Sequence, residues 1–253
     1  MALKIIITGA SSGIGEALAR EYAKQGAILG LIARRAGVLA RLKDTLTITC
    51  LTYAADVRDS QAMQQAAGDF IRQHGCPDVV IANAGISRGT LTEKAEDLEA
   101  FQQILDINMM GIVKTFHPFL AKMREQKRGT LVGIASISGF RGLPGAGAYS
   151  ASKAAAISYL ESLRVELHGS GVRVLTVCPG YIATPMTADN PYPMPFIISA
   201  EAAAKKIIRA IERQRKFLVI PWQMAVLGRI LKILPLWLYD RELSKAPRKP
   251  RDS

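Results

Sequence analysis

The stretch Thr8-Gly9-Ala10-Ser11-Ser12-Gly13-Ile14-Gly15 follows a short apolar run at residues 3–7 and opens a segment with apolar residues at helical spacing. Glycine lets the backbone approach a ligand closely, and the free N–H groups at the start of a helix attract an anion. A strand, a glycine-rich turn and a helix in this order are typical of a site for a dinucleotide pyrophosphate. Three glycines at one junction disfavour the alternative, a turn that binds nothing.

Short apolar runs alternate with longer helical segments along most of the chain. Near-continuous apolar strands separated by helices indicate a parallel sheet that is covered on both faces. Right-handed crossovers then wind the sheet into a doubly wound, Rossmann-like α/β fold, with ligands at the carboxyl ends of the strands. Further strands are predicted at 28–33, 51–55, 79–82, 130–135, 172–177 and 217–220.

No boundary divides the chain of 253 residues, in which 49% of the residues are apolar. We therefore expect one domain over residues 1–221, then a helical extension at 222–245 and a disordered tail at 246–253. The proline-rich segment 190–195 suits neither a helix nor a strand. It predicts a substrate loop at about 185–200, lying over the crevice.

The residues after the second predicted strand distinguish two nicotinamide dinucleotides. In folds that bind NAD, an Asp or Glu at this place holds the ribose 2′-hydroxyl. Here the position is Ala33, and Arg34 and Arg35 follow it. Guanidinium groups bind a 2′-phosphate with paired hydrogen bonds, whereas a carboxylate would repel it. The pattern favours NADP(H) over NAD(H); the alternative is two surface arginines in a loop.

Tyr149 and Lys153 lie four residues apart in a helix-forming run, so their side chains share one face of the predicted helix. A free Tyr side chain has a pKa of about 10 and is a poor base at neutral pH. A nearby ammonium stabilises the phenolate and brings the pKa closer to the working pH. Such a pair also occurs by chance on many helices. Ser136, expected at the crevice end of the strand at 130–135, strengthens the catalytic interpretation.

With these motifs the chain resembles the short-chain dehydrogenase/reductase family, of the compact single-domain type with TGxxxGxG and YxxxK, over about residues 3–220. The resemblance implies an oxidoreductase that moves a hydride reversibly between NADP(H) and a small-molecule carbonyl or alcohol, a ketone or aldehyde. It implies that Tyr149 is the catalytic acid or base, and that Lys153 lowers its pKa and binds the nicotinamide ribose. Ser136 would hydrogen-bond the substrate oxygen; Ser138 is a weaker alternative. The resemblance also implies a homodimer or homotetramer.

The resemblance extends to residues outside the catalytic pair. Asn108 matches an asparagine that supports a proton relay with Lys153, although it would equally brace a helix. Asp56 and Val57 match the pair beside the adenine ring, and 179–184 matches the segment that holds the nicotinamide amide. The segment 83–85 fits the cofactor cradle, although the common first asparagine is replaced by alanine. The implied cofactor residues are Gly9, Ser11, Ser12, Gly13, Ile14, Gly15, Arg34, Arg35, Asp56, Val57, Asn83, Ala84, Gly85, Tyr149, Lys153, Pro179, Gly180, Ile182 and Thr184.

The formal net charge is +12, and about half of it lies in residues 211–253. Such an excess favours an anionic partner: nucleic acid, a lipid surface or the phosphorylated cofactor. Only 6% of the residues are aromatic, so we expect no nucleic-acid binding. A catalytically silent NADP-binding sensor or scaffold is the alternative function, which the complete set Tyr149, Lys153, Ser136 and Asn108 disfavours.

The extension 222–245 is basic and amphipathic, and Pro235 should break or kink its helix. It fits packing within the fold or oligomer, a lid over the crevice, or peripheral contact with an anionic membrane. Membrane contact would favour an apolar or lipid-like substrate. Three cysteines without CxxC spacing, no secretory leader and no apolar stretch of ~18 residues predict a cytoplasmic protein, with membrane association at most at its periphery. The three scattered histidines predict no metal site.

Overall fold

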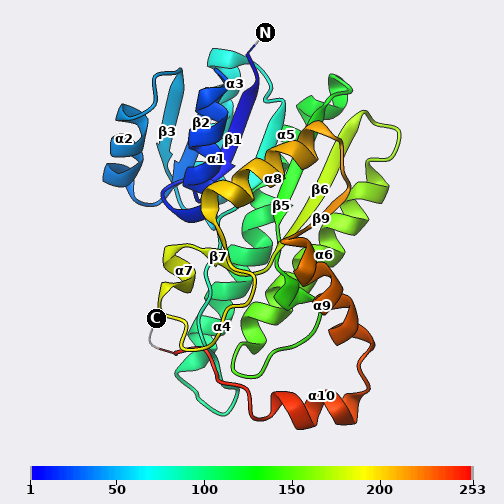
Figure 1. The fold of residues 1–253 in the computed structure, drawn as a ribbon. Helices are drawn as coiled ribbons and strands as arrows, with labels where there is room; N and C mark the ends of the chain where they lie inside the picture. Colours follow the sequence, from blue (N-terminus) through cyan, green and yellow to red (C-terminus); the bar gives the residue numbers. More distant parts are fainter. Residues whose placement is uncertain (1, 252–253) are drawn as a thin grey trace.

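The computed structural model describes residues 2–251, which form a seven-stranded parallel sheet between two layers of helices (Figure 1). The strand order is β3-β2-β1-β4-β5-β6-β9. Strands β2 and β3 are added on one side of β1, and the chain then crosses to the other side, where β4 and the later strands follow. This confirms the predicted doubly wound, Rossmann-like fold. All seven predicted strands form, with ends shifted by at most two residues. They are β1 (Lys4–Thr8), β2 (Ile28–Ala33), β3 (Cys50–Ala54), β4 (Val79–Ala82), β5 (Gly129–Ile134), β6 (Val172–Pro179) and β9 (Phe217–Ile220).

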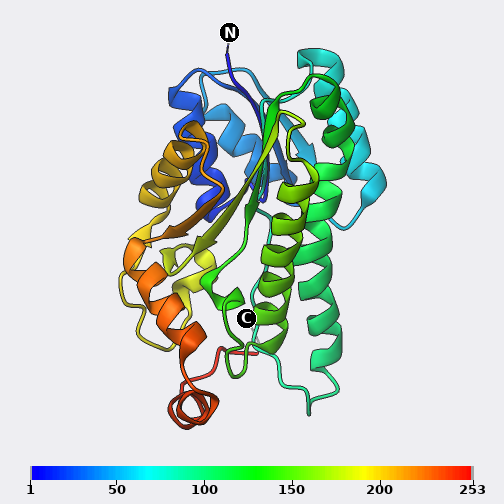
Figure 2. The same ribbon diagram turned by 90° about the vertical axis from the view of Figure 1, so that its right-hand side faces the viewer.

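The sheet carries a hydrophobic core on each face because successive strand residues point to opposite sides. In β1, Ile5 and Ile7 join one core and Ile6 joins the other, and all three are fully buried. Figure 2 shows the two helix layers on either side of the sheet. One layer contains α1 (Gly13–Lys24), α2 (Ala36–Asp44) and α8 (Ala200–Glu212). The other contains α3 (Ser60–His74), α4 (Asp97–Leu105), α5 (Gly111–Glu125) and α6 (Gly147–Glu166).

The segment beyond β6 contains elements that the sequence did not predict. Strands β7 (Ile182–Ala183) and β8 (Ile198–Ser199) pair in parallel, and the short helix α7 (Pro185–Ala188) follows β7. Each strand has only two residues, which is too short for an alternating pattern to appear. Their pairing brings together the two ends of the segment expected to form the substrate loop.

The extension forms two helices, α9 (Trp222–Ile233) and α10 (Leu236–Leu243), separated at Pro235 as predicted. Residues 246–251 differ from the expected disorder. Arg251 forms ion pairs with Glu96 and Asp97, and the Gly89 amide donates to the Pro250 carbonyl at 2.9 Å. Contacts distant in sequence hold this segment in place; residues 252–253 lie outside the described part of the chain. Within residues 2–251, no helix is long and apolar enough to cross a bilayer.

Candidate active site

The glycine turn joins β1 to α1 at the point where the strand order reverses. Gly9 has a φ of +66°, and a Cβ there would lie 2.8 Å from the Ala84 Cα atom. A Cβ on Gly15 would collide with the Gly9 carbonyl oxygen. The Ser12 side chain precedes α1 but makes no capping hydrogen bond to it. Bare backbone and an uncapped helix start fit the pyrophosphate of a dinucleotide.

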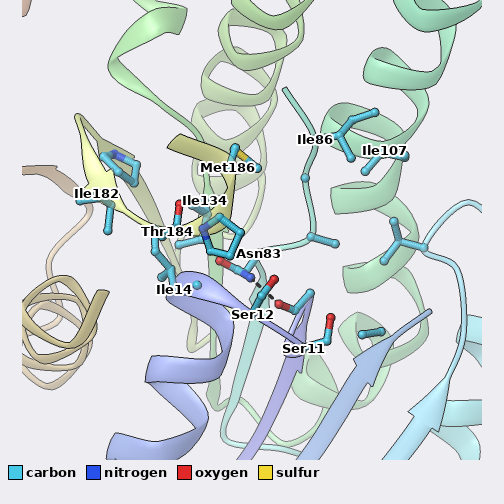
Figure 3. A pocket seen from close by; sticks show the side chains of 18 of the residues that line it. Ser11, Ser12, Ile14, Asn83, Ile86, Ile107, Ile134, Ile182, Thr184 and Met186 are labelled. Atoms are coloured by element: carbon cyan, nitrogen blue, oxygen red, sulfur yellow. Dashed lines mark hydrogen bonds between the residues drawn. The ribbon is translucent and has the colours of Figure 1, made fainter. Parts of the chain in front are cut away.

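Asn83, directly after β4, ties this turn to the neighbouring strand. Its side-chain amide donates to the carbonyls of Thr8 at 3.0 Å and Gly9 at 3.2 Å. Its backbone N–H donates to the Thr8 hydroxyl at 3.1 Å, and the Ala84 N–H reaches the same hydroxyl at 3.3 Å. These bonds therefore fix the glycine turn, which follows β1, to the segment that follows β4. Figure 3 shows Ser11, Ser12 and Asn83 together at the ends of these strands.

Arg34 and Arg35, at the end of β2, line a cavity that the glycine turn also lines. The Arg35 guanidinium donates to the Ser11 hydroxyl at 2.9 Å and to the Ser12 hydroxyl at 3.1 Å, so it lies against the glycine turn. Asp56 is the one acidic residue among those that line the cavity in the described chain. Its carboxylate is paired with Arg58 at 2.8 Å, and this hydrogen bonding holds the pKa of Asp56 below its usual value. This end of the cavity therefore presents cations to an anionic group.

The opposite end of the cavity holds Tyr149, Lys153 and Ser136. Tyr149 and Lys153 lie one turn apart on α6, with the lysine Nζ atom 5.8 Å from the centre of the phenol ring. Lys153 is 4% exposed, and its ammonium donates to the carbonyl of Ile134 at 2.9 Å. Ser136 follows β5, and its hydroxyl accepts the Ser138 N–H at 3.1 Å. The structure thus brings the three residues to one place.

Burial controls the titration of both α6 residues. It raises the pKa of Tyr149, and a hydrogen bond with Ser136 acts in the opposite direction. Burial lowers the pKa of Lys153 to about 8. The resemblance implied that Lys153 lowers the pKa of Tyr149. Here the ammonium bonds to a backbone carbonyl, and desolvation of the phenol dominates.

Asn108 is fully buried in a π-helical turn, Asp106–Met110, between α4 and α5. Its side-chain oxygen accepts the Ile86 N–H at 2.9 Å, and its amide donates to the Ile86 carbonyl at 2.9 Å and to the Ser152 hydroxyl at 3.0 Å. Ser152 in turn donates to the Tyr149 carbonyl at 2.7 Å. Asn108 therefore braces α6 from behind the cavity. Such π-turns are frequent at functional sites.

Every predicted catalytic and cofactor residue lines this one cavity except Gly15 and Asn108, both of which are buried. Figure 3 shows Ile182 and Thr184 on one side of it and Ile86 and Ile107 on the other. The sequence did not predict Ile86 and Ile107, because no local pattern shows that an isolated isoleucine in a loop or helix lines a cavity. Ala55, Ile134 and Ala135 were not predicted either. Ala33 was expected at the ribose position, and the segment predicted as the substrate loop contains the lining residues Pro185, Met186 and Thr187, none of which was predicted individually.

Thr187 had a local signal that could have revealed it. Thr184 and Pro185 form the start of α7, and the Thr187 hydroxyl accepts the Thr184 N–H at 3.2 Å. The Thr187 hydroxyl also donates to the Ile182 carbonyl at 2.6 Å. This arrangement fixes the first turn of the substrate segment against the cavity.

Comparison with known proteins agrees with this geometry. The family model described as short chain dehydrogenase matches residues 4–193. An uncharacterized oxidoreductase of Myxococcus xanthus is 39% identical over 93% of this chain and 94% of that protein. The 11-beta-hydroxysteroid dehydrogenase 1A of Arabidopsis thaliana is 33% identical over 86% of this chain and 68% of that protein. The chain belongs to the short-chain dehydrogenase/reductase family.

Solved structures share the fold. An alcohol dehydrogenase from Thermococcus sibiricus, complexed with 5-hydroxy-NADP, has a TM-score of 0.76 and 25% identity over 87% of this chain and 96% of that one. A Burkholderia phymatum family member in complex with NAD has a TM-score of 0.83 and 24% identity over 98% and 97% of the two chains. The protein is thus an oxidoreductase with a nucleotide-binding Rossmann fold, an enzyme that acts on CH–OH or C=O groups.

Proposed function

We propose that the protein is an NADP(H)-dependent ketone or aldehyde reductase, reversible as an alcohol dehydrogenase, with Tyr149 as its proton donor and acceptor. The observation that carries the proposal is that Tyr149, Lys153 and Ser136 line the same cavity as the glycine turn. A glycine turn that suits a pyrophosphate and a group that can transfer a proton line one cavity, as a dinucleotide-dependent oxidoreductase requires. Residues 1–221 would form the catalytic domain, with 185–200 as its substrate segment.

The two arginines after β2 support NADP(H). Ala33 occupies the position where a carboxylate would hold a ribose 2′-hydroxyl, and Arg34 and Arg35 follow it at the cavity. Arg35 is positioned by its bonds to Ser11 and Ser12, so its guanidinium needs little reordering to meet a phosphate. The adenine would lie beside Asp56 and Val57.

The mechanism uses this chain's side chains to handle the substrate oxygen. When bound, the nicotinamide supplies or accepts the hydride at the carbonyl carbon. In reduction, the Tyr149 hydroxyl donates its proton to that oxygen while the Ser136 hydroxyl hydrogen-bonds and polarises it. The raised pKa of Tyr149 keeps the phenol protonated at neutral pH, which suits donation. Lys153 would bind the nicotinamide ribose and stabilise the phenolate that remains. Asn108 would position this pair by bracing α6 through Ser152.

An apolar substrate fits the walls of the cavity. Ile86, Ile107 and Met186 line it, and Phe196 and Ile197 in the substrate segment are exposed to 52% and 43%. The relatives named as 11-beta-hydroxysteroid dehydrogenases also favour an apolar carbonyl or alcohol. A homodimer or homotetramer, common in this family, is the proposed assembly.

The test is turnover measured by loss of NADPH absorbance with aldehydes and ketones of increasing chain length, each repeated with NADH. The proposal expects turnover with NADPH, a lower rate with NADH and a preference for apolar carbonyls. Tight NADPH binding by fluorescence without turnover of any carbonyl would support the silent sensor instead.

A further inference from the structure

Helices α9 and α10 lie at the end of the molecule opposite α2 (Figure 1). Both carry large apolar side chains that are exposed. Within α9 these residues follow one another at spacings of four, four and three, which places them on one face of the helix. Large exposed apolar surfaces mark interaction sites. We call this surface the apolar face; it consists of Trp222, Val226, Ile230, Ile233, Leu236 and Trp237, which are between 49% and 81% exposed.

The apolar face is held rigidly from its inner side. Gly228 packs against the ring of Phe140, where a Cβ would lie 2.5 Å from a ring carbon. The Arg141 guanidinium donates to the carbonyls of Leu231 at 2.5 Å and Leu234 at 2.7 Å. Because Phe140 and Arg141 belong to the segment between Ser136 and Tyr149, the apolar face is fixed to the catalytic end of the cavity.

The charged residues on α9 have one sign, whereas α10 carries the exposed acids Asp240 and Glu242 beside Arg241. Between Glu212 and Asp240 the sequence contains no acidic residue. Arg229 and Lys232 are exposed on α9, and Arg229 lies within one helical turn of Val226 and Ile233. The other cations of this stretch are Arg213, Arg215 and Lys216. The α9 part of the apolar face, whose own charged residues are all cations, is complementary to a partner that is both apolar and anionic.

We propose that the apolar face docks on the surface of an anionic lipid bilayer. Tryptophans near each end suit the boundary between headgroups and acyl chains, and the cations suit acidic headgroups. The contact is peripheral, since no helix within residues 2–251 is able to span a bilayer. A second copy of the chain fits less well, because pairing two such faces would bring their cations together. The proposal does not depend on the cofactor or the substrate.

The first experiment removes apolar surface. Full-length protein is floated with vesicles of phosphatidylcholine alone or with added phosphatidylserine, and the bound fraction is measured. We expect binding to the anionic vesicles, and roughly tenfold weaker binding for each tryptophan replaced in Trp222→Ser and Trp237→Ser, because interfacial burial of each ring is lost. The control is Val165→Ser on α6, which removes an apolar side chain that is 62% exposed elsewhere and should not change binding.

The second experiment reverses charge. Arg229→Glu and Lys232→Glu should each weaken binding to anionic vesicles more than fivefold. Loss of one cation near an anionic surface weakens binding by about fivefold, and the new carboxylate is also repelled by the acidic headgroups. The matched control, Arg41→Glu with Lys43→Glu, reverses two exposed cations on α2 and should leave binding unchanged. Added salt should weaken binding of the wild-type protein. Circular dichroism and thermal unfolding check that each variant remains folded, independently of cofactor binding and turnover.

Three results would overturn the proposal. The first is wild-type protein that stays unbound to anionic vesicles at low salt. The second is equal loss of binding in the apolar-face variants and in the controls. The third is a dimer, seen by analytical ultracentrifugation, that dissociates on Trp222→Ser with Trp237→Ser, because the apolar face would then be a contact between subunits.

Discussion

Arg251 and Asp97 form an ion pair across 154 residues of sequence, with the guanidinium Nε atom 2.8 Å from a carboxylate oxygen whose side chain is 5% exposed. The same oxygen accepts the Leu91 N–H at 2.8 Å. Two residues before Arg251, the Lys249 ammonium donates to the Met186 carbonyl at 3.3 Å. Residues 246–251 thus join the loop after β4 to the substrate segment.

Replacing Arg251 by alanine should break the contact between residues 246–251 and the loop after β4 while leaving the hydrophobic cores intact. We expect faster hydrogen exchange in residues 88–97 and 246–251, with little change in Tm, because neither hydrophobic core contains residues of these two segments. Hydrogen exchange read by mass spectrometry measures the effect. Arg213→Ala, which removes an exposed arginine at the end of α8, is the control. Unchanged exchange in 88–97 would show that the ion pair does not hold the segment.

The same ion pair predicts a pH dependence. Hydrogen bonding from Arg251 lowers the pKa of Asp97 from its ordinary value of 3.8. A carboxyl group with a depressed folded-state pKa stabilises the fold above its unfolded pKa, and the contribution disappears as the pH falls through the folded value. Protection of the amides in residues 246–251, measured relative to the intrinsic exchange rate at each pH, should therefore fall below about pH 4 in the wild type and should already be low at pH 7 in Asp97→Asn. Equal pH profiles for the two proteins would contradict this.

Tyr149→Phe should abolish proton transfer without disturbing the cofactor site. Removing a general acid typically costs about 10²–10⁴-fold in rate, so we expect a fall of that size in kcat. NADPH affinity, measured by fluorescence titration, should change little, because the phenol ring stays in place. Tyr159→Phe on the same helix, outside the cavity, is the control. Near-normal turnover by Tyr149→Phe would remove Tyr149 from the mechanism.

Arg34→Ala with Arg35→Ala should reduce the preference for NADPH. Hydrogen bonds to charged groups contribute about 1.5–3 kcal/mol each, so the Kd for NADPH should rise by at least roughly tenfold while that for NADH changes little. The ratio of the two Kd values, measured by titration, is the readout. Arg41→Ala on α2 should leave the ratio unchanged. A parallel rise in both Kd values would indicate general disruption of the turn.

Ser152→Ala tests the hydrogen bond by which Asn108 supports α6 behind the cavity. It would leave one N–H of the buried Asn108 amide without its partner, a loss of about 1–3 kcal/mol in the free energy of unfolding. Ser162→Ala, which removes an exposed serine on the same helix, should cost less than about 0.5 kcal/mol. Urea denaturation compares the two. A loss for Ser152→Ala no larger than that of the control would mean that Asn108 finds another acceptor.

The order of strands and helices was predictable because it depends on local patterns. The run Ile5-Ile6-Ile7 predicts a strand that is buried on both faces, and both hydrophobic cores contain residues from it. The glycines that follow indicate a close approach of the backbone to a ligand. The spacing of Tyr149 and Lys153 placed both on one helical face, and the cavity contains both. Helical and strand periodicity act over a few residues, so a linear sequence carries them directly.

Other features depend on residues that only folding brings together. The Lys153 ammonium bonds to the Ile134 carbonyl, and the burial that this placement imposes sets the direction of its pKa shift. Arg251 meets Asp97 where the sequence alone suggested disorder. Local pattern therefore determined the family, the fold and the set of candidate residues. The tertiary structure decided their hydrogen-bond partners and desolvation, because both arise from packing between segments far apart in the chain.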